Sequence, residues 1–219
     1  MLIGMGSGTD AWMFLSSSLG NPEDPEQDVD TRRMLRFTQG DPQAFEQLFN
    51  KYSRAIINFA LKFVGDQAMA EDLAQEIFLK VYTGKTTYRA EAKFKTWLYR
   101  IASNACISEL RKPRYRQAFQ SLDTPAGADY EEGPRAVEVP APEGMGPLQQ
   151  LEVKEMRRAL KAAVTALPEN QRLAFILTRY QNLSYQEVAV VLNSSESAVK
   201  SLIHRARETL MVRLRLLDR

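Results

Sequence analysis

The chain has 219 residues, of which 44% are hydrophobic and 26% are charged, the balance of a soluble globular protein. Its single cysteine, Cys106, excludes an internal disulfide, and its single histidine, His204, argues against a zinc site. No run approaches the roughly 18 apolar residues of a membrane span, and the apolar stretch 11–15 has no basic flank of the kind a signal peptide carries. We therefore expect a cytoplasmic protein without membrane insertion.

The net charge of +2 hides blocks of opposite sign. Residues 1–30 carry six acids and no Lys or Arg, and residues 117–147 carry six acids against Arg135. Residues 31–116 have sixteen basic and eight acidic groups, and residues 148–219 have twelve and seven. The two basic blocks are predicted to face a polyanion. The acidic segments are predicted to be disordered and to fold back loosely on the basic faces of the free protein.

Between residues 31 and 116 the pattern predicts a helical bundle, beginning with a short helix at about 31–39. Asp41 is an N-cap with Pro42 at the first helical position, and Gly65 ends the long helix that follows. Its inward residues recur at spacings of three and four: Phe45, Leu48, Phe49, Tyr52, Ile56, Phe59, Ala60 and Phe63. A second helix runs from Asp66 to about Gly84. After a polar loop, a third helix has Phe94, Trp97, Leu98, Ile101 and Ala105 inward and ends before Pro113.

Segment 117–147 has five Pro and four Gly, which predicts an extended linker. Residues 148–167 then form a helix, and Pro168 opens another that runs to about Tyr180. Ser184 and Glu187 form a capping box for a third helix. Ser194 is predicted to cap the last helix, whose core stripe is Val199, Leu202, Ile203, Ala206 and Leu210. The fold class is therefore all-α, with two small helical domains joined by a disordered linker.

A short polar turn between a small helix and a long basic one is the plan of a helix-turn-helix, whose second helix enters the major groove of DNA. The outward positions of that second helix are Ser197, Lys200, Ser201, His204, Arg205 and Arg207. Lys and Arg side chains can donate to guanine or to phosphates, and Ser can contact either. A solvated helical hairpin with a basic outer face is the alternative, and spacing alone supports both equally.

Two longer stretches extend this pattern. The stretch LPENQRLAFILTRYQNLSYQEVAVVLNSSESAVKSLIHRARETL resembles region 4 of bacterial sigma factors, which reads the −35 promoter element. The run AEDLAQEIFLKVY, followed by YRAEAKFKTWLYRIASNACISELRK, is similar to region 2, which in the family binds the polymerase clamp and opens the −10 element. Both lie in the family order and cover about 42–116 and 150–217, as in the small extracytoplasmic-function class. Asn182, Ser197 and Leu202 depart from the usual residues, which leaves the fold intact and the promoter sequence open.

The resemblance implies that Asp72, Gln75 and Glu76 meet a basic coiled-coil surface of the largest polymerase subunit, although an ordinary solvated face is the plain alternative. Residues 85–116 combine nine Lys or Arg with two acids and several aromatic rings. Stacking on an aromatic ring contributes about 1–3 kcal/mol per base, comparable to the cost of extruding one. The expected −10 and melting residues are Tyr88, Arg89, Lys93, Phe94, Lys95, Trp97 and Arg100.

Within that set, the loop 87–92 is the candidate pocket for a captured base, and Tyr88 is the preferred stacking ring because it lies in the loop. Lys93, Lys95 and Arg100 are assigned to phosphates. Helical spacing offers a competing reading of Phe94, Trp97 and Leu98 as members of the core, which we accept for Leu98 and for the inner edge of Trp97.

The resemblance divides the chain into an acidic extension (1–30), region 2 (31–116), the linker (117–147) and region 4 (148–219). It implies a role in transcription initiation with no catalytic residue, cofactor or metal. The expected partners are core RNA polymerase, through its clamp coiled coil and flap, promoter DNA, and a cognate anti-sigma factor. The expected location is the cytoplasm, at the nucleoid with polymerase or near the membrane with an anti-sigma factor.

Two rival functions predict different features. A free-standing helix-turn-helix regulator would dimerise on a palindromic operator and would not need the basic, aromatic segment 85–116. An enzyme acting on nucleic acid would need clustered carboxylates or metal ligands, whereas the acids here are scattered through helices.

Overall fold

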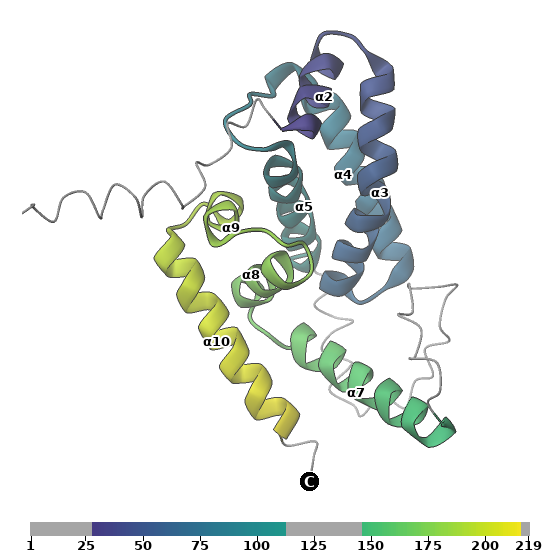
Figure 1. Cartoon of the computed structure of the whole chain (residues 1–219), viewed down its shortest axis with the longest axis vertical. Coiled ribbons are helices and arrows are strands. Elements are labelled where there is room, and N and C mark those ends of the chain that lie inside the picture. The colour runs from purple at the N-terminus through teal and green to yellow at the C-terminus, as the bar shows by residue number, and fades with distance from the viewer. Residues whose placement is uncertain (1–27, 113–145, 216–219) are drawn as a thin grey trace, which may run out of the picture.

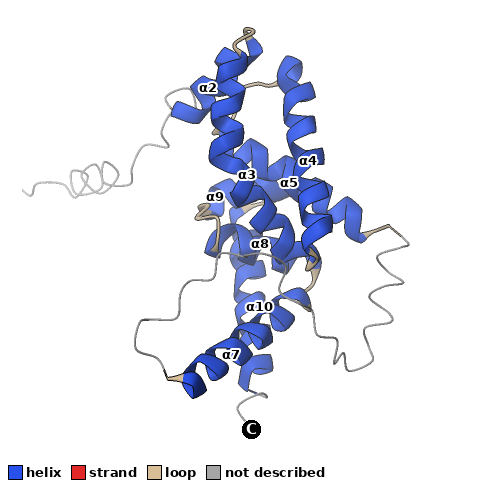
Figure 2. Cartoon of the chain, turned by 90° about the vertical axis from the view of Figure 1, so that its right-hand side faces the viewer, coloured by secondary structure: helices blue, strands red, loops and turns tan. Residues whose placement is uncertain are grey.

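The computed structural model describes residues 28–112 and 146–215, and the regular elements within these ranges are helices (Figures 1 and 2). We call residues 28–112 the N-terminal bundle and residues 146–215 the C-terminal unit. Most of the predicted acidic extension and nearly all of the predicted linker lie outside the described residues. The bundle contains α2 (Val29–Thr38), α3 (Pro42–Val64), α4 (Gln67–Thr83), the 3-10 helix η2 (Gly84–Thr87) and α5 (Phe94–Leu110). The C-terminal unit contains α7 (Pro147–Thr165), α8 (Glu169–Arg179), α9 (Tyr185–Leu192) and α10 (Glu196–Arg215).

The helix boundaries in the bundle follow from local capping chemistry. Asp41 Oδ1 accepts hydrogen bonds from the backbone N–H groups of Gln43 and Ala44, at 3.0 and 3.3 Å, and Pro42 occupies the first turn of α3. Gly65 ends α3 in the left-handed conformation, with φ of 82°, which a residue without Cβ adopts without strain. Asp66 then caps α4. These predicted boundaries are confirmed, whereas η2 falls in the stretch predicted to be a loop.

The bundle core lies where α3 packs against α2, α4 and α5. Its largest fully buried side chains are Met34, Leu48, Ile56, Phe59, Phe63, Ile77, Phe94, Leu98 and Tyr99. Phe49, predicted to point inward, is 42% exposed, so the inward stripe of α3 is narrower than its apolar pattern suggests. Cys106 is fully buried, and burial, reinforced by Glu76 and Glu109, raises its pKa to about 12.

A buried carboxylate joins α2 to α3. Asp30 is 3% exposed and accepts hydrogen bonds from Tyr52 Oη at 2.6 Å, from Arg33 Nη1 at 2.7 Å, and from Lys51. Burial alone would raise the pKa of this carboxyl, but the hydrogen bonds from Lys51, Tyr52 and Arg33 outweigh it and hold the pKa below its ordinary value of 3.8. The carboxylate is therefore ionised at neutral pH and stabilises the junction of the two helices.

Replacing this carboxylate by an amide in the Asp30→Asn variant is expected to lower the free energy of unfolding at pH 7 by about 1–3 kcal/mol, because three donors lose a charged acceptor. The folded-state pKa lies below the unfolded value of about 3.9, so the stabilisation is present above that pH and is lost as the pH falls through the folded-state pKa. Urea unfolding at several pH values measures the difference. The exposed Glu46→Gln change is the control, and a difference that stays constant down to acid pH would contradict this account.

The C-terminal unit is assembled in the same way. Pro168 precedes α8, and Ser184 begins α9 with a full capping box to Glu187, as predicted. Its core combines residues of all four helices: Val164, Leu173, Ile176, Leu177, Val188, Val199, Ile203, Ala206 and Leu210. Within the described residues, no helix combines the length and apolar character needed to cross a membrane.

The two parts of the chain pack against one another. Helix α9 lies on α5, and α7 and α8 both contact α3 (Figure 1). Helix α10 lies on the far side of α8 and α9 from the bundle (Figure 1). This packing was not predicted from the sequence, which indicated two domains separated by a linker.

Candidate nucleic-acid and protein interfaces

The predicted acidic stripe lies on the outer face of α4. Asp72, Gln75 and Glu76 are all exposed, whereas Leu73 and Ile77 lie on the inner face of the helix and turn into the core. Glu76 forms an ion pair with Lys80 one turn along the helix, at 2.6 Å. These three side chains therefore share one solvent-facing surface, which a partner can reach without any rearrangement of the bundle.

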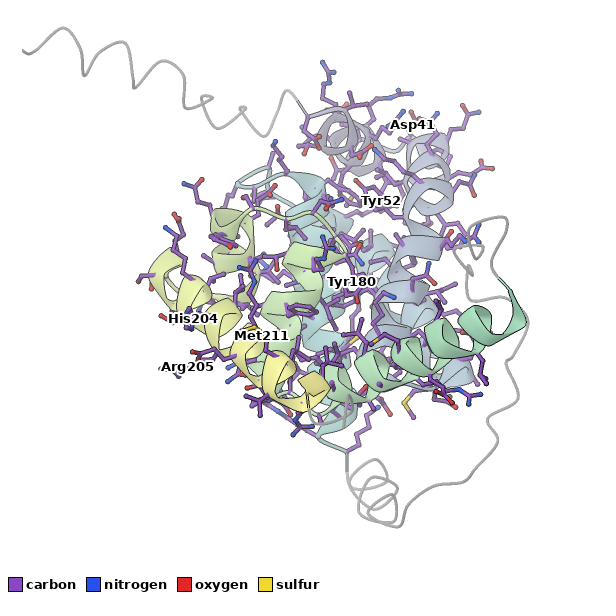
Figure 3. All side chains as sticks on the ribbon, turned by 60° about the horizontal axis from the view of Figure 1, so that its bottom comes forward. Asp41, Tyr52, Tyr180, His204, Arg205 and Met211 are labelled. Atoms are coloured by element: carbon purple, nitrogen blue, oxygen red, sulfur yellow. The ribbon has the colours of Figure 1, made fainter. Side chains whose placement is uncertain are left out.

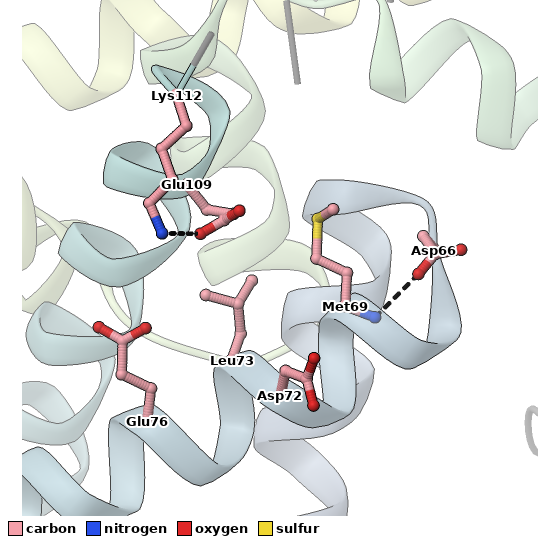
Figure 4. Close-up of a pocket in the computed structure, with 7 residues that line it drawn as sticks. All are labelled: Asp66, Met69, Asp72, Leu73, Glu76, Glu109 and Lys112. Carbon is pink, nitrogen blue, oxygen red and sulfur yellow. Dashed lines mark hydrogen bonds and ion pairs between the residues drawn. The ribbon is translucent and has the colours of Figure 1, made fainter. Parts of the chain in front are cut away.

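Asp72 and Glu76 border a groove of about 340 Å³ between α4 and α5 (Figure 4). Its walls are formed by Asp66, Met69, Asp72, Leu73, Glu76, Glu109 and Lys112. Across the groove from α4, Glu109 accepts a hydrogen bond from Lys112 at 2.5 Å. The sequence did not reveal the part played by these last two residues, because they lie more than thirty positions away, Glu109 in the last turn of α5 and Lys112 just beyond its end.

Next to the acidic stripe, α4 also exposes apolar side chains. Leu79 is 63% exposed and Tyr82 is 47% exposed. The Tyr82 ring also packs on the rings of Phe37 and Phe45, with both centroid distances 5.3 Å, so Leu79 and Tyr82 add apolar surface beside the acidic stripe.

The segment predicted to melt DNA separates into exposed cations and buried rings. Arg89 and Arg100 are exposed, while Lys93, Lys95 and Trp97 are partly buried. Tyr88 is only 3% exposed, and its ring packs edge-on against Trp97 with centroids 4.9 Å apart. In this arrangement Tyr88 therefore has no free face for a base, although it was the preferred stacking ring. Tyr88 directly follows η2, which ends at Thr87, so it borders a helical turn rather than lying in the open loop that the sequence predicted.

Phe94 also belongs to the interior. It is 0% exposed and contacts the rings of Tyr52 and Trp97, at centroid distances of 5.5 and 6.0 Å. Its backbone N–H donates to Thr31 Oγ1 at 2.9 Å, which fixes the start of α5 against α2. The competing reading of Phe94 as a core residue thus describes its place in this structure.

The loop 87–92 lines a pocket of about 260 Å³. The lining residues are Thr87, Arg89, Glu91, Ala92, Trp97 and Arg100 from the bundle, and Val190 from α9. Trp97 supplies an aromatic edge and the two arginines supply positive charge, a combination suited to an unstacked base and its phosphate. Val190 could not be identified from the sequence, because it enters this pocket only through the packing of α9 on α5.

Helices α9 and α10 form the predicted helix-turn-helix. Ser184 N donates to Glu187 at 2.8 Å, and Glu187 N donates to Ser184 Oγ at 3.2 Å, which completes the capping box. Asn193 ends α9 in the left-handed region with φ of 48°. Ser195, rather than the predicted Ser194, caps α10, because its Oγ accepts from the N–H of Ala198 at 3.2 Å. Asn182 adopts φ of 51°, a left-handed conformation that asparagine tolerates better than most residues.

The predicted DNA-facing residues of α10 are all exposed: Ser197, Lys200, Ser201, His204, Arg205 and Arg207. Figure 3 shows His204 and Arg205 pointing outward from the helix. Lys200 Nζ pairs with Glu196 at 2.8 Å, and the hydrogen bond that the lysine donates to this carboxylate raises the pKa of the lysine. His204 Nδ1 lies 3.3 Å from Glu208. Each of these two acids can release its partner to a phosphate, since both pairs are exposed to solvent.

Comparisons with known proteins agree with this arrangement. The family model for sigma-70 region 2 matches residues 48–116, and the model for sigma-70 region 4 matches residues 157–210. The chain is 34% identical over 185 residues to the RNA polymerase sigma-H factor of Pseudomonas aeruginosa, covering 84% of this chain and 93% of the relative. It is 30% identical over 187 residues to the ECF RNA polymerase sigma-E factor of Escherichia coli, covering 84% of this chain and 94% of the relative.

Solved structures show the same fold. One is the complex of CnrH with the cytosolic domain of CnrY, with a TM-score of 0.61, 23% identity, and coverage of 87% of this chain and 98% of the other. Another is the sigma factor RpoE of Bartonella quintana in complex with the anti-sigma factor NepR, with a TM-score of 0.56, 27% identity, and coverage of 80% and 98%. The chain therefore belongs to the sigma-70 family, as an RNA polymerase sigma factor of the extracytoplasmic-function type.

Proposed function

We propose that this sigma factor divides its tasks between three surfaces. The acidic stripe of α4, Asp72, Gln75 and Glu76, binds the clamp coiled coil of core RNA polymerase. The outer face of α10 reads the −35 element through Ser197, Lys200, Ser201, His204, Arg205 and Arg207. The pocket around the loop 87–92 receives an unstacked base of the −10 element, with Arg89, Lys93, Lys95 and Arg100 toward phosphates. Region 2 then corresponds to residues 31–116 and region 4 to residues 148–219.

The observation that carries this proposal is the co-occurrence of the three surfaces on one family fold. The acidic stripe and the helix-turn-helix are both exposed without rearrangement, and they lie on separate halves of the chain. The chemistry of the stripe suits a basic protein surface, whereas the arginines of the loop and of α10 suit phosphates and base edges. As a member of the sigma-factor family, the protein is proposed to act by binding, without catalytic activity of its own.

The remaining partners follow from the relatives. An anti-sigma factor is proposed as a regulatory partner, since the sigma factor RpoE of Bartonella quintana was solved in complex with one. We place the protein in the cytoplasm, at the nucleoid when it is bound to polymerase and near the membrane when an anti-sigma factor holds it there. The polymerase flap is the proposed contact for the C-terminal unit.

The base-capture role is tested by the Arg89→Ala/Arg100→Ala variant. Both side chains are exposed, so the fold should be retained. Holoenzyme with this variant is expected to bind its promoter but to open it about tenfold less, because two phosphate-facing cations are missing next to the pocket. Permanganate reactivity of unpaired thymines measures opening. The Arg32→Ala/Arg54→Ala variant, which removes two cations outside this segment, is the control, and equal opening by both variants would refute the assignment.

A further inference from the structure

A single residue of the C-terminal unit is held by two side chains of the bundle. The backbone carbonyl of Gln181, in the turn between α8 and α9, accepts a hydrogen bond from Lys95 Nζ at 2.6 Å. Its side-chain Oε1 accepts from Tyr99 Oη at 2.5 Å. Lys95 and Tyr99 are one turn apart on α5, so both donors lie on the same face. We call these two contacts the Gln181 latch. Tyr99 is 1% exposed, so Gln181 provides an acceptor for a hydroxyl that is otherwise buried.

A second cross-contact reinforces the latch. Arg172 of α8 is 7% exposed, and its Nη1 donates to the backbone carbonyl of Phe63 at 2.8 Å. The guanidinium lies 4.9 Å from the centroid of the Phe63 ring. Phe63 is in the last turn of α3, where carbonyl groups have no partner within the helix and the helix dipole is negative. A cation from the C-terminal unit therefore completes the end of a bundle helix.

We call the packing of the C-terminal unit on the bundle the closed packing. It affects the two DNA-binding surfaces unequally. Val190 of α9 forms part of the wall of the pocket that also contains Arg89, Trp97 and Arg100. Lys95, proposed for a phosphate, is partly buried and donates to Gln181 instead. By contrast, the DNA-facing residues of α10 are exposed. The proposed −10 surface around the loop 87–92 is thus partly covered by the C-terminal unit, while the proposed −35 surface on the outer face of α10 is open.

The closed packing also cannot serve both promoter elements at once. Their names place the −35 and −10 elements about 25 base pairs apart, which is roughly 85 Å along B-form DNA. In the closed packing the pocket borders α9, the first helix of the helix-turn-helix itself. The 34 residue steps from Lys112 to Gly146 could reach at most about 115 Å, so the length of the chain permits the two halves to separate.

From these contacts we propose that the Gln181 latch, supported by Arg172, holds the free protein in a closed state in which α9 masks the single-strand pocket of region 2 and leaves the recognition helix free. The proposal rests on the role given to that pocket under Proposed function. The apparent affinity for single-stranded DNA is then the intrinsic affinity multiplied by the fraction of molecules that are open. Any change that opens the latch raises that fraction and therefore the apparent affinity.

The test changes Gln181 in both directions. Gln181→Lys places a cation beside Lys95 and removes the acceptor for Tyr99, so it opens the chain. Gln181→Glu keeps an acceptor for Tyr99, now charged, and adds a negative charge beside Lys95, whose bond to the backbone carbonyl is unchanged, so it closes the chain further. All variants carry Trp12→Phe, which leaves Trp97, in the pocket wall, as the only tryptophan. Emission and acrylamide quenching of Trp97 report opening. Anisotropy of fluorescein-labelled DNA of mixed sequence, single-stranded and duplex, reports binding.

We expect Gln181→Lys to red-shift and expose Trp97 and to bind the single strand about tenfold more tightly relative to the duplex, and Gln181→Glu to do the reverse. Gln186→Lys adds the same charge on the exposed side of α9 and controls for simple attraction to DNA. Unchanged Trp97 emission, or a gain no larger than that of Gln186→Lys, would overturn the latch. A shift of Trp97 emission without single-strand binding in any variant would overturn the masking role. It would also overturn the base-capture assignment made under Proposed function.

Discussion

Reversing two charges on α4, in the Asp72→Arg/Glu76→Arg variant, is expected to abolish stable association with core RNA polymerase. Both side chains are exposed, and Glu76 pairs with a neighbouring Lys80 that is itself half exposed, so the fold should not change. Placing two cations against a basic partner surface costs several kcal/mol, because attraction is replaced by like-charge repulsion. The dissociation constant should therefore rise by about 100-fold or more.

Co-purification of tagged protein with core polymerase at moderate salt, followed by titration of the labelled factor, measures this effect. The matched control is Glu46→Arg/Glu155→Arg, which makes the same change in net charge at exposed positions of α3 and α7. We expect the control to retain most of its affinity. Equal affinities for the two variants would show that α4 is not the docking surface. Failure of the wild-type chain to bind, together with sequence-specific duplex binding, would favour a free-standing regulator.

Truncating Arg205 to Ala is expected to weaken binding of the holoenzyme to its own promoter by about tenfold, since one good side-chain contact to a base edge is worth about 1–3 kcal/mol. The matched control is Arg213→Ala. Arg213 is also an exposed arginine of α10, but it lies two turns further from the end of the recognition helix that enters the groove. We expect its removal to leave promoter affinity almost unchanged.

Fluorescence anisotropy with a promoter duplex and with a mixed-sequence duplex separates base reading from general attraction. A base contact predicts a loss on the promoter that is about tenfold larger than the loss on the mixed duplex. A uniform loss on both, with the salt slope reduced by about one, would instead place Arg205 on a phosphate. Equal losses in Arg205→Ala and Arg213→Ala would remove the reading role from this part of α10.

The helix boundaries could be predicted because each depends on residues only a few positions apart. Asp41 with Pro42, the left-handed Gly65, and the capping box of Ser184 with Glu187 are all local devices. The last N-cap was misplaced by one residue because two adjacent serines can both serve, and only the geometry distinguishes them.

Contacts between distant segments could not be predicted in this way. Gln181 meets Tyr99 across 82 positions and Arg172 meets Phe63 across 109, and neither pair belongs to a periodic pattern. The burial of Tyr88 has a similar origin, since a loop position carries no periodicity to indicate its direction. The candidate α10 residues were easier to find because helical spacing alone places them opposite the buried stripe of Val199, Ile203, Ala206 and Leu210.

The central claim, that this chain directs polymerase to particular promoters, is tested most directly by transcription in vitro. Core RNA polymerase, with and without the chain, is given genomic DNA of the source bacterium, and the 5′ ends of the transcripts are mapped. We predict a limited set of start sites that depend on the chain, share common −35 and −10 sequences, and disappear with the Asp72→Arg/Glu76→Arg variant. Transcripts that are identical with and without the chain would contradict the account.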